Sequence, residues 1–345
     1  MMAEEESCFL RACRGRQVPY TPVWVMRQSG RYLEEYRKIR KRVSFLELCK
    51  TPELATEVAV MAQAKIKADA AIVFSDLLLI LETWGMKLDY PEKGGPVVSP
   101  GITSTRDIDH LPEDDPVSSL SFVLDAVRLT RSALPRAIPL IGFAGAPFTL
   151  ASYLLEGGKS KGFEKTKKWM HENQDAWGKL LEKIVRGVGA FVRAQIKAGV
   201  DCIQVFDSWA GCLLQEEYEQ FVFPFSKKLF ESIPKGIPVI HFGTGTAPFL
   251  EIFSGAGGDV VGIDHGLNLH AAWQRIGPKK AIQGNLDPRV LLEDPKTIQK
   301  EVERILLEAG GRPGHIFNLG HGVLPETPVE HVIAMMEAVH ELSRR

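Results

Sequence analysis

The sequence is organised as a repeated unit in which a short apolar run is followed by a polar or glycine-rich turn and then by a helical pattern. Eight such runs are present, at residues 23–26, 71–74, 140–143, 203–206, 239–241, 260–263, 281–283 and 315–318. Most of the runs do not alternate between apolar and polar residues, which is typical of strands that are buried on both faces. Each run is therefore predicted to be a strand of a parallel sheet.

Helical patterns supply the other half of each unit, and they cover about 51–68, 163–198, 215–232, 295–309 and 328–343. Asp294 and Thr327 are predicted N-caps, because a proline follows each at the first helical position. Glu330 is predicted to complete a capping box with Thr327. Strand and helix alternating eight times predict a (β/α)8 TIM barrel, a single domain over residues 1–345. The alternative is a doubly wound open sheet.

Two segments depart from simple alternation. Residues 86–100 are predicted to form an inserted hairpin that turns at Lys93-Gly94-Gly95. Residues 137–155 contain no charged side chain and approach the length of a membrane span. The glycines and prolines of this segment favour a buried strand, a turn and a helix start instead. The sequence therefore predicts no membrane partner.

The composition excludes some classes of protein. Lysine and arginine number 42 and aspartate and glutamate 43, a balance that argues against a nucleic-acid partner. The five cysteines are odd in number and form no CxxC motif, which indicates a reducing compartment. The first residues lack the basic and apolar regions of a secretory signal. We expect a cytoplasmic protein, or one of the plastid stroma if a transit peptide precedes this numbering.

Functional side chains of a TIM barrel gather at the carboxyl ends of its strands. The first strand is followed by Arg27-Gln28-Ser29-Gly30-Arg31, in which Gly30 permits a tight turn. Two arginines directly after an apolar strand are unusual for a turn. Their planar guanidinium groups pair bidentately with carboxylates or phosphates. The pattern predicts a ligand with more than one anionic group.

Ser75 and Asp76 follow the second run and precede another apolar stretch. An aspartate in such surroundings is destabilising unless it is paired. One interpretation is a structural acid that caps a helix or binds one of the arginines. The other is a carboxylate that faces a cation or N–H donors of the ligand.

Motifs for common cofactors are incomplete. Gly158-Lys159-Ser160 resembles the end of a phosphate-binding loop, but Tyr153 stands where that motif requires glycine. Gly243-Thr244-Gly245 lacks the third glycine of a dinucleotide fingerprint. The histidines show no metal-ligand spacing, and His265 is interpreted as structural or exposed. His321 is the exception, because glycines flank it at the end of the eighth strand.

Several motifs resemble those of the uroporphyrinogen decarboxylase family. They are MRQSGRYLEEYR, IVFSD, GFAGAPFTLASYLLEGG, QVFDSWAG, HFGTGT, GNLDP and FNLGHGVLPETPVEHV, and they span nearly the whole chain in the family's order. The resemblance implies a single (β/α)8 barrel that acts as a homodimer and uses no metal or organic cofactor. It implies removal of carbon dioxide from the four acetate side chains of uroporphyrinogen III, which gives coproporphyrinogen III in haem and chlorophyll biosynthesis. The enzyme would be a carboxy-lyase.

The resemblance also implies which residues bind the substrate. They are Arg27, Gln28, Ser29, Gly30, Arg31, Arg40, Phe45, Ser75, Asp76, Phe143, Tyr153, Phe206, Ser208 and His321. Among them Asp76 would be the catalytic acid that holds the pyrrole N–H groups. Phe143 and Phe206 would line the flat macrocycle. Glu34 departs from the family pattern, which commonly has proline there.

A tetrapyrrole with eight carboxylates agrees with clustered arginines in a nearly neutral protein, and its four N–H groups agree with one acidic acceptor. Loss of carbon dioxide leaves carbanion character on a methylene carbon, and a protonated pyrrole ring would accept those electrons. Asp76 would stabilise the cationic ring by preorganised charge. Two alternatives stay open: a zinc-dependent corrinoid or folate methyltransferase of a related barrel, and a non-catalytic tetrapyrrole-binding protein.

Overall fold

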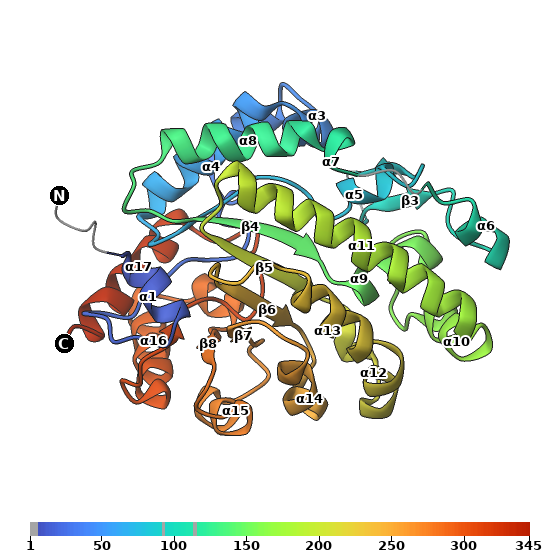
Figure 1. The fold of residues 1–345 in the computed structure, drawn as a ribbon. Coiled ribbons are helices and arrows are strands. Elements are labelled where there is room, and N and C mark those ends of the chain that lie inside the picture. The colour runs from blue at the N-terminus through green and yellow to red at the C-terminus, as the bar shows by residue number, and fades with distance from the viewer. Residues whose placement is uncertain (1–5, 92–93, 113–115) are drawn as a thin grey trace.

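Parallel strands form the centre of the computed structural model, which describes residues 6–91, 94–112 and 116–345. Within these ranges seven strands make one sheet in the order β1-β4-β5-β6-β7-β8-β9. The strands are β1 (Ala71–Ile72), β4 (Leu140–Gly145), β5 (Cys202–Asp207), β6 (Val239–Gly243), β7 (Val260–Gly262), β8 (Ala281–Gln283) and β9 (His315–Ile316). The sheet curls, helices cover its outer side, and the arrows of β4, β5 and β6 point to one end of the molecule (Figure 1). The predicted α/β TIM-barrel architecture is confirmed.

The first predicted strand, 23–26, is wrong as a regular strand, although it lies where a first barrel strand belongs. Only Val23 forms a bridge, and its partner is Phe317 beyond β9. The Phe317 N–H donates to the Pro22 carbonyl at 2.8 Å, and the Asp69 N–H donates to the Val23 carbonyl at 2.9 Å. The segment thus joins the two edges of the sheet. Beside β1 the segment is too short to form a ladder of backbone hydrogen bonds. The backbone turns away at Arg27, whose φ is 61°.

A buried polar chain crosses the interior of the barrel and ties this segment to the strands. Trp24 Nε1 donates to Gln283 Oε1 at 3.0 Å, and Gln283 Nε2 donates to Gln204 Oε1 at 3.0 Å. All three side chains are buried. Buried polar groups of this kind are stable only when hydrogen-bonded, so the chain fixes how the segment sits against β5 and β8.

The helices alternate with the strands, and several are shorter than predicted. The larger ones are α4 (Pro52–Ile66), α8 (Ser121–Ala133), α9 (Pro147–Glu156), α10 (Glu164–Glu172), α11 (Gln174–Ala198), α12 (Gln215–Phe221), α13 (Phe223–Glu231), α15 (Leu269–Ile276), α16 (Pro295–Ala309) and α17 (Val329–Leu342). The remaining ones, none longer than seven residues, are α1 (Cys8–Cys13), α2 (Glu34–Arg40), α3 (Phe45–Lys50), α5 (Leu79–Glu82), α6 (Thr105–Asp109), α7 (Pro116–Ser119) and α14 (Leu250–Gly255). Three short 3₁₀ helices of the described chain are Ala210–Cys212, Ala247–Phe249 and Pro288–Leu292.

Two predicted helices are each divided in the structure. The pattern over 163–198 breaks at Asn173, whose φ of −130° and ψ of 53° leave the helical region. The pattern over 215–232 breaks at Val222, because Pro224 in the first turn of α13 cannot continue a helix that has already begun. The apolar periodicity continues across both breaks, so the sequence pattern does not predict them.

One predicted cap is confirmed and one is wrong. The Asp294 carboxylate accepts from the backbone N–H groups of Lys296 and Thr297. At the other helix Pro328 is the N-cap and Thr327 caps nothing. The Thr327 hydroxyl is buried without a hydrogen-bond partner in the described structure, so it accepts no N–H group of the helix.

The predicted hairpin is confirmed as β2 (Lys87–Asp89) paired with β3 (Val97–Ser99). Part of its predicted turn, Lys93, lies outside the described residues. Val98 N donates to the Gly157 carbonyl at 2.8 Å, which fastens the hairpin to the end of α9. The uncharged stretch 137–155 forms β4 and most of α9, as expected. Among the described helices none is long and apolar enough to cross a membrane.

Asp69 is predicted to stabilise the barrel closure. Its Oδ2 accepts from the buried Val23 N–H at 2.7 Å and lies 2.7 Å from His340 Nε2. Asp69→Ala leaves the Val23 N–H without this acceptor, so we expect the free energy of unfolding to fall by about 1–3 kcal/mol. Urea titration measures it. Asp125→Ala is the control, because Asp125 pairs with Arg128 on an exposed helix face. Equal stability of the two variants would contradict the prediction.

Candidate active site at the carboxyl ends of the strands

Asp76 lies beyond the end of β1, and the residue as a whole is half-buried. Its Oδ1 accepts two hydrogen bonds, from Leu78 N at 2.8 Å and from the Tyr90 hydroxyl at 2.6 Å. Its Oδ2 accepts none from the described part of the chain. Burial raises the pKa of Asp76, while the bonds from Tyr90 and Leu78 and the charge of Arg27 act in the opposite direction. One oxygen is therefore fixed by the protein and the other is available to a ligand.

Arg27 and Arg31 bring positive charge to the same end of the barrel. Both side chains reach solvent. In the ranges that the structure describes, neither guanidinium group forms a hydrogen bond or an ion pair. Loss of hydration and the neighbouring charge of Arg31 lower the pKa of Arg27, whereas Tyr153 and Asp76 raise it. The two arginines are thus free to bind an anion near Asp76.

Glycines leave room for Arg27. A Cβ atom on Gly30 would lie 2.7 Å from the Arg27 carbonyl oxygen, and one on Gly322 would overlap the Arg27 side chain. Both contacts are closer than real Cβ atoms approach. The loop after β9 therefore shapes the place that Arg27 occupies.

Gln28 and Ser29 point away from this opening. The Gln28 side chain is completely buried, and its Nε2 donates to the Ala70 carbonyl at 3.3 Å. Ser29 Oγ donates to the Val58 carbonyl at 3.4 Å. Both side chains lie beneath the site and support the turn that carries the arginines, so the structure does not bring them together with Asp76.

Arg40 and Phe45 flank Asp76 through an aromatic cluster. The Arg40 guanidinium lies 5.9 Å from the centre of the Phe45 ring and also donates to the Val43 carbonyl. Phe45 packs against Tyr90 with ring centres 4.7 Å apart. The predicted pair is therefore connected to Asp76 through Tyr90, whose position in the hairpin no site motif indicated.

An aromatic wall stands on β4 and β5. Phe143 and Phe206 are partly exposed and meet edge to face, with ring centres 5.8 Å apart. Phe242 on β6 extends the row at 5.8 Å from Phe206. A small hollow with room for little more than one water molecule lies beside Phe143 and is lined by Ser75, Asp76, Phe143 and mostly apolar side chains. A flat apolar ligand body fits such a wall.

Tyr153 of α9 approaches from the side of β5. Burial and then the charge of Asp76 raise its pKa to about 12. Its ring packs against Trp209 at 5.9 Å between centres. The Ser208 carbonyl accepts from Thr244 Oγ1 at 2.7 Å, which fixes the turn after β5 against the turn after β6. Tyr153 therefore lies within electrostatic reach of Asp76.

His321 completes the ring of loops. Its side chain reaches solvent, but partial loss of hydration of the imidazole and then the charges of Arg27 and His265 lower its pKa. A Cβ atom on Gly320 would overlap the backbone of His265, so the loop after β9 packs directly on the loop after β7. His321 and Arg27 therefore share one side of the opening.

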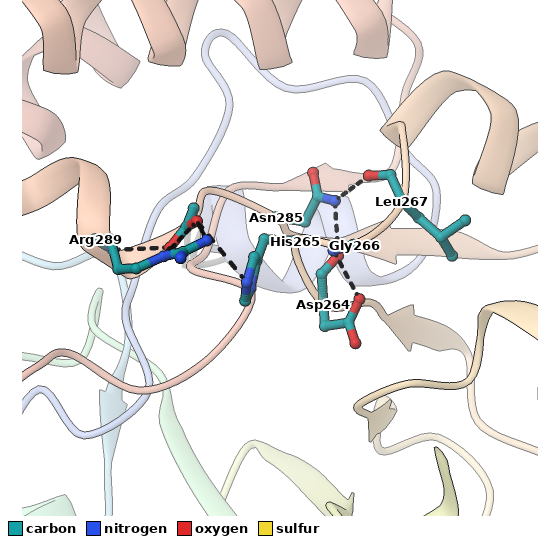
Figure 2. Close-up of polar contacts among 7 residues, drawn as sticks. Asp264, His265, Gly266, Leu267, Asn285 and Arg289 are labelled. Carbon is teal, nitrogen blue, oxygen red and sulfur yellow. Dashed lines mark hydrogen bonds and ion pairs between the residues drawn. The ribbon is translucent and has the colours of Figure 1, made fainter. Parts of the chain in front are cut away.

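The loops after β7 and β8 form a hydrogen-bonded group whose mutual contacts the sequence did not indicate (Figure 2). Asn285 Nδ2 donates to the carbonyls of Asp264 and Leu267 at 2.8 and 2.7 Å. His265 Nε2 lies 3.8 Å from Asp287 Oδ2, and Arg289 also pairs with Asp287. The available signals were the position of His265 after an apolar run and the GNLDP motif that contains Asn285 and Asp287. This group makes a rigid rim beside His321.

No cluster of three or more His, Cys, Asp or Glu side chains that could hold a metal ion occurs in the described ranges. The polar groups of the site are arranged instead as one acid, two arginines without partners, a tyrosine and a histidine around an aromatic wall. Such a set recognises an anionic ligand that also presents hydrogen-bond donors.

Structural comparison supports the fold. A methyltransferase from Methanosarcina mazei superposes with a TM-score of 0.83 at 20% sequence identity, covering 98% of this chain and 99% of that one. A B12-independent methionine synthase from Shewanella sp. W3-18-1 gives a TM-score of 0.59 at 10% identity over 87% of this chain and 91% of that one. At these identities the similarity concerns the fold alone.

Sequence comparison identifies the family. The family model described as uroporphyrinogen decarboxylase (URO-D) matches residues 4–342. A uroporphyrinogen decarboxylase from Carboxydothermus hydrogenoformans is 48% identical, with 97% of this chain and 96% of that protein covered. One from Syntrophotalea carbinolica is 46% identical, with 99% of this chain and 100% of that protein covered. A barrel with this site and these relatives leads to one conclusion: the chain belongs to the uroporphyrinogen decarboxylase family.

Proposed function

We propose that this protein is a carboxy-lyase that removes carbon dioxide from the four acetate side chains of uroporphyrinogen III and gives coproporphyrinogen III. The observation that supports this most directly is that an acid and two arginines lie at the same site and form no salt bridge with one another. Arg27 and Arg31 have no partner among the described residues, and Asp76 keeps one oxygen free. The carboxylates of the substrate would pair with the two arginines, and its pyrrole N–H groups would donate hydrogen bonds to Asp76 Oδ2.

The roles of the remaining residues follow from their places. Phe143 and Phe206 would contact the faces of the macrocycle. Arg40, Tyr153, Ser208 and His321 would add polar contacts at its edge, and Gly30 would let the arginine loop approach. The buried Gln28 and Ser29 would act through the backbone that they support.

The chemistry needs a sink for two electrons. A proton added to a pyrrole ring carbon makes the ring cationic, and the acetate carboxylate can then leave as carbon dioxide while its bond electrons move into the ring. Protonation of the methylene carbon gives the methyl group, and loss of the first proton restores the pyrrole. Asp76, held rigidly by two donors, would stabilise the cationic ring before and during this step.

We also infer one domain over residues 1–345 and a homodimer without nucleic-acid or membrane partners. The support for the dimer is the family resemblance. Sedimentation of the purified protein tests it. The non-catalytic alternative, a tetrapyrrole-binding protein, would share the pocket and would differ only in turnover.

The first prediction about the reaction concerns activity without a cofactor. Purified protein that has been dialysed against a strong chelator should release carbon dioxide from uroporphyrinogen under reducing conditions in the dark, because the substrate ring is itself the electron sink. Product formation by chromatography measures the activity. A large loss that zinc restores would favour the methyltransferase alternative, and binding without turnover would favour the non-catalytic one.

The second prediction concerns the arginines. Arg27→Lys and Arg31→Lys keep the charge but lose the planar fork that pairs with a carboxylate. We expect kcat/KM to fall at least about tenfold in each variant, since one bidentate charge-assisted pair contributes about 1.5–3 kcal/mol. Arg128→Lys on α8 is the matched control, because Arg128 pairs with Asp125 away from the site. Wild-type kinetics in both site variants would remove the arginines from binding.

The third prediction concerns the charge of Asp76. Asp76→Asn keeps the shape and a hydrogen-bond acceptor but removes the charge. We expect a folded protein that still binds a porphyrin product analogue and decarboxylates about 100- to 1000-fold more slowly. Single-turnover kinetics measure the chemical step, and thermal melting controls for folding. Normal turnover in the folded variant would leave Asp76 as a structural acid.

A further inference from the structure

Of the two groups that hold the Asp76 carboxylate, Tyr90 makes the shorter contact and is the one that reaches it with a side chain. Its hydroxyl donates to Asp76 Oδ1 at 2.6 Å, on the same oxygen that Leu78 N reaches at 2.8 Å. Two donors on one oxygen define the plane of the carboxylate. The second oxygen, Oδ2, then has a fixed direction.

The hairpin holds Tyr90 firmly in this place. Tyr90 directly follows β2, and the partner strand β3 is fastened to α9 by the Val98–Gly157 hydrogen bond. Beyond β3, Ile102 N donates to the Leu154 carbonyl at 2.8 Å. The Tyr90 ring packs on Phe45 at 4.7 Å between centres. Backbone pairing on one side and an aromatic ring on the other leave the hydroxyl little freedom.

We propose that Tyr90 is a positioning residue for the reaction: its hydroxyl occupies Asp76 Oδ1 and so presents Oδ2 to the pyrrole N–H groups of the substrate. The hairpin is thus part of the active site, although its backbone adds no strand to the barrel. This inference rests on the proposed function of Asp76. It assigns to Tyr90 an effect on the reaction that acts through Asp76.

The electrostatic surroundings of Asp76 give the proposal a measurable consequence. Besides Tyr90 and the Leu78 N–H, the titratable groups that face Asp76 are Arg27, Tyr153 of α9 and Cys49 of α3. Burial raises the pKa of Asp76, and the Tyr90 hydrogen bond is the largest effect that lowers it. A hydrogen bond to the ionised form favours that form. Without it the pKa of Asp76 rises, and the acidic limb of the pH profile moves to higher pH.

Tyr90→Phe tests the proposal because it removes only the hydroxyl. We expect the acidic limb of kcat/KM to move up by about one pH unit, which is about a tenfold loss of kcat/KM on that limb. The carboxylates of the substrate titrate equally in both proteins, so the difference belongs to the enzyme. Tyr20→Phe is the matched control. The Tyr20 hydroxyl also donates to an aspartate, Asp69 Oδ1 at 3.2 Å, but it lies before β1 at the opposite end of the barrel. Its pH profile should match that of the wild type.

A second readout separates this inference from the proposed function. Titration of ¹³C-labelled aspartate carboxyls by NMR, with Asp76 assigned from the Asp76→Asn spectrum, measures the pKa of Asp76 without substrate. A raised pKa in Tyr90→Phe supports the contact even if the wild type releases no carbon dioxide, which would refute the function alone. An unchanged pKa and an unchanged pH profile would overturn the proposal and leave Tyr90 as packing.

A substitution that strengthens the hydrogen bond to Asp76 tests the proposal even if the Tyr90→Phe variant fails to fold. Replacement of Tyr90 by 3-fluorotyrosine lowers the pKa of the phenol and makes it a stronger donor at nearly the same size. The acidic limb should then move to lower pH, and movement to higher pH or none would contradict the proposal.

Discussion

The barrel and its opening both depend on the paired hydrogen bonds between Val23 and Asp69. The Asp69 N–H donates to the Val23 carbonyl, and the Asp69 carboxylate accepts from the Val23 N–H. This reciprocal contact holds the irregular first segment against β1, while Phe317 holds its other edge. Arg27 lies just beyond Val23, and Asp76 lies just beyond the strand that Asp69 precedes. The charged groups of the site are therefore neighbours because the barrel closes there.

Around this closure the protein separates the charges that it offers to a ligand. Asp76 is bonded by neutral donors and not by an arginine, and the two arginines remain without protein partners in the described structure. A salt bridge between them would have to be broken before binding. The neutral donors hydrogen-bond to one oxygen of the Asp76 carboxylate. The positive charge of the arginines is therefore available to a ligand. Under the proposed function, this arrangement would supply the preorganised charge that stabilises a transition state.

The sequence predicted the repeating fold well, because buried parallel strands leave short apolar runs that local composition reveals. It failed where tertiary contacts decide. Residues 23–26 have the composition of a strand but only one bridging partner. Asn173 interrupts a continuous apolar period through its backbone angles. In the site, Asp76 and the arginines were evident from their places after strands. The burial of Gln28 and the contact of Tyr90 were not, since both arise from elements distant in the chain.

The left-handed backbone of Arg27 has a consequence for the evolution and engineering of this barrel. A side chain with φ near 61° is less stable there than glycine, by about 1–2 kcal/mol. A search for thermostable variants guided only by folding energy would therefore replace Arg27 with glycine. Such a variant would gain stability and lose the guanidinium that faces Asp76. Under the proposed function, selection for heat resistance and selection for catalysis would oppose each other at this position, and a designer would exclude it from any stabilising library.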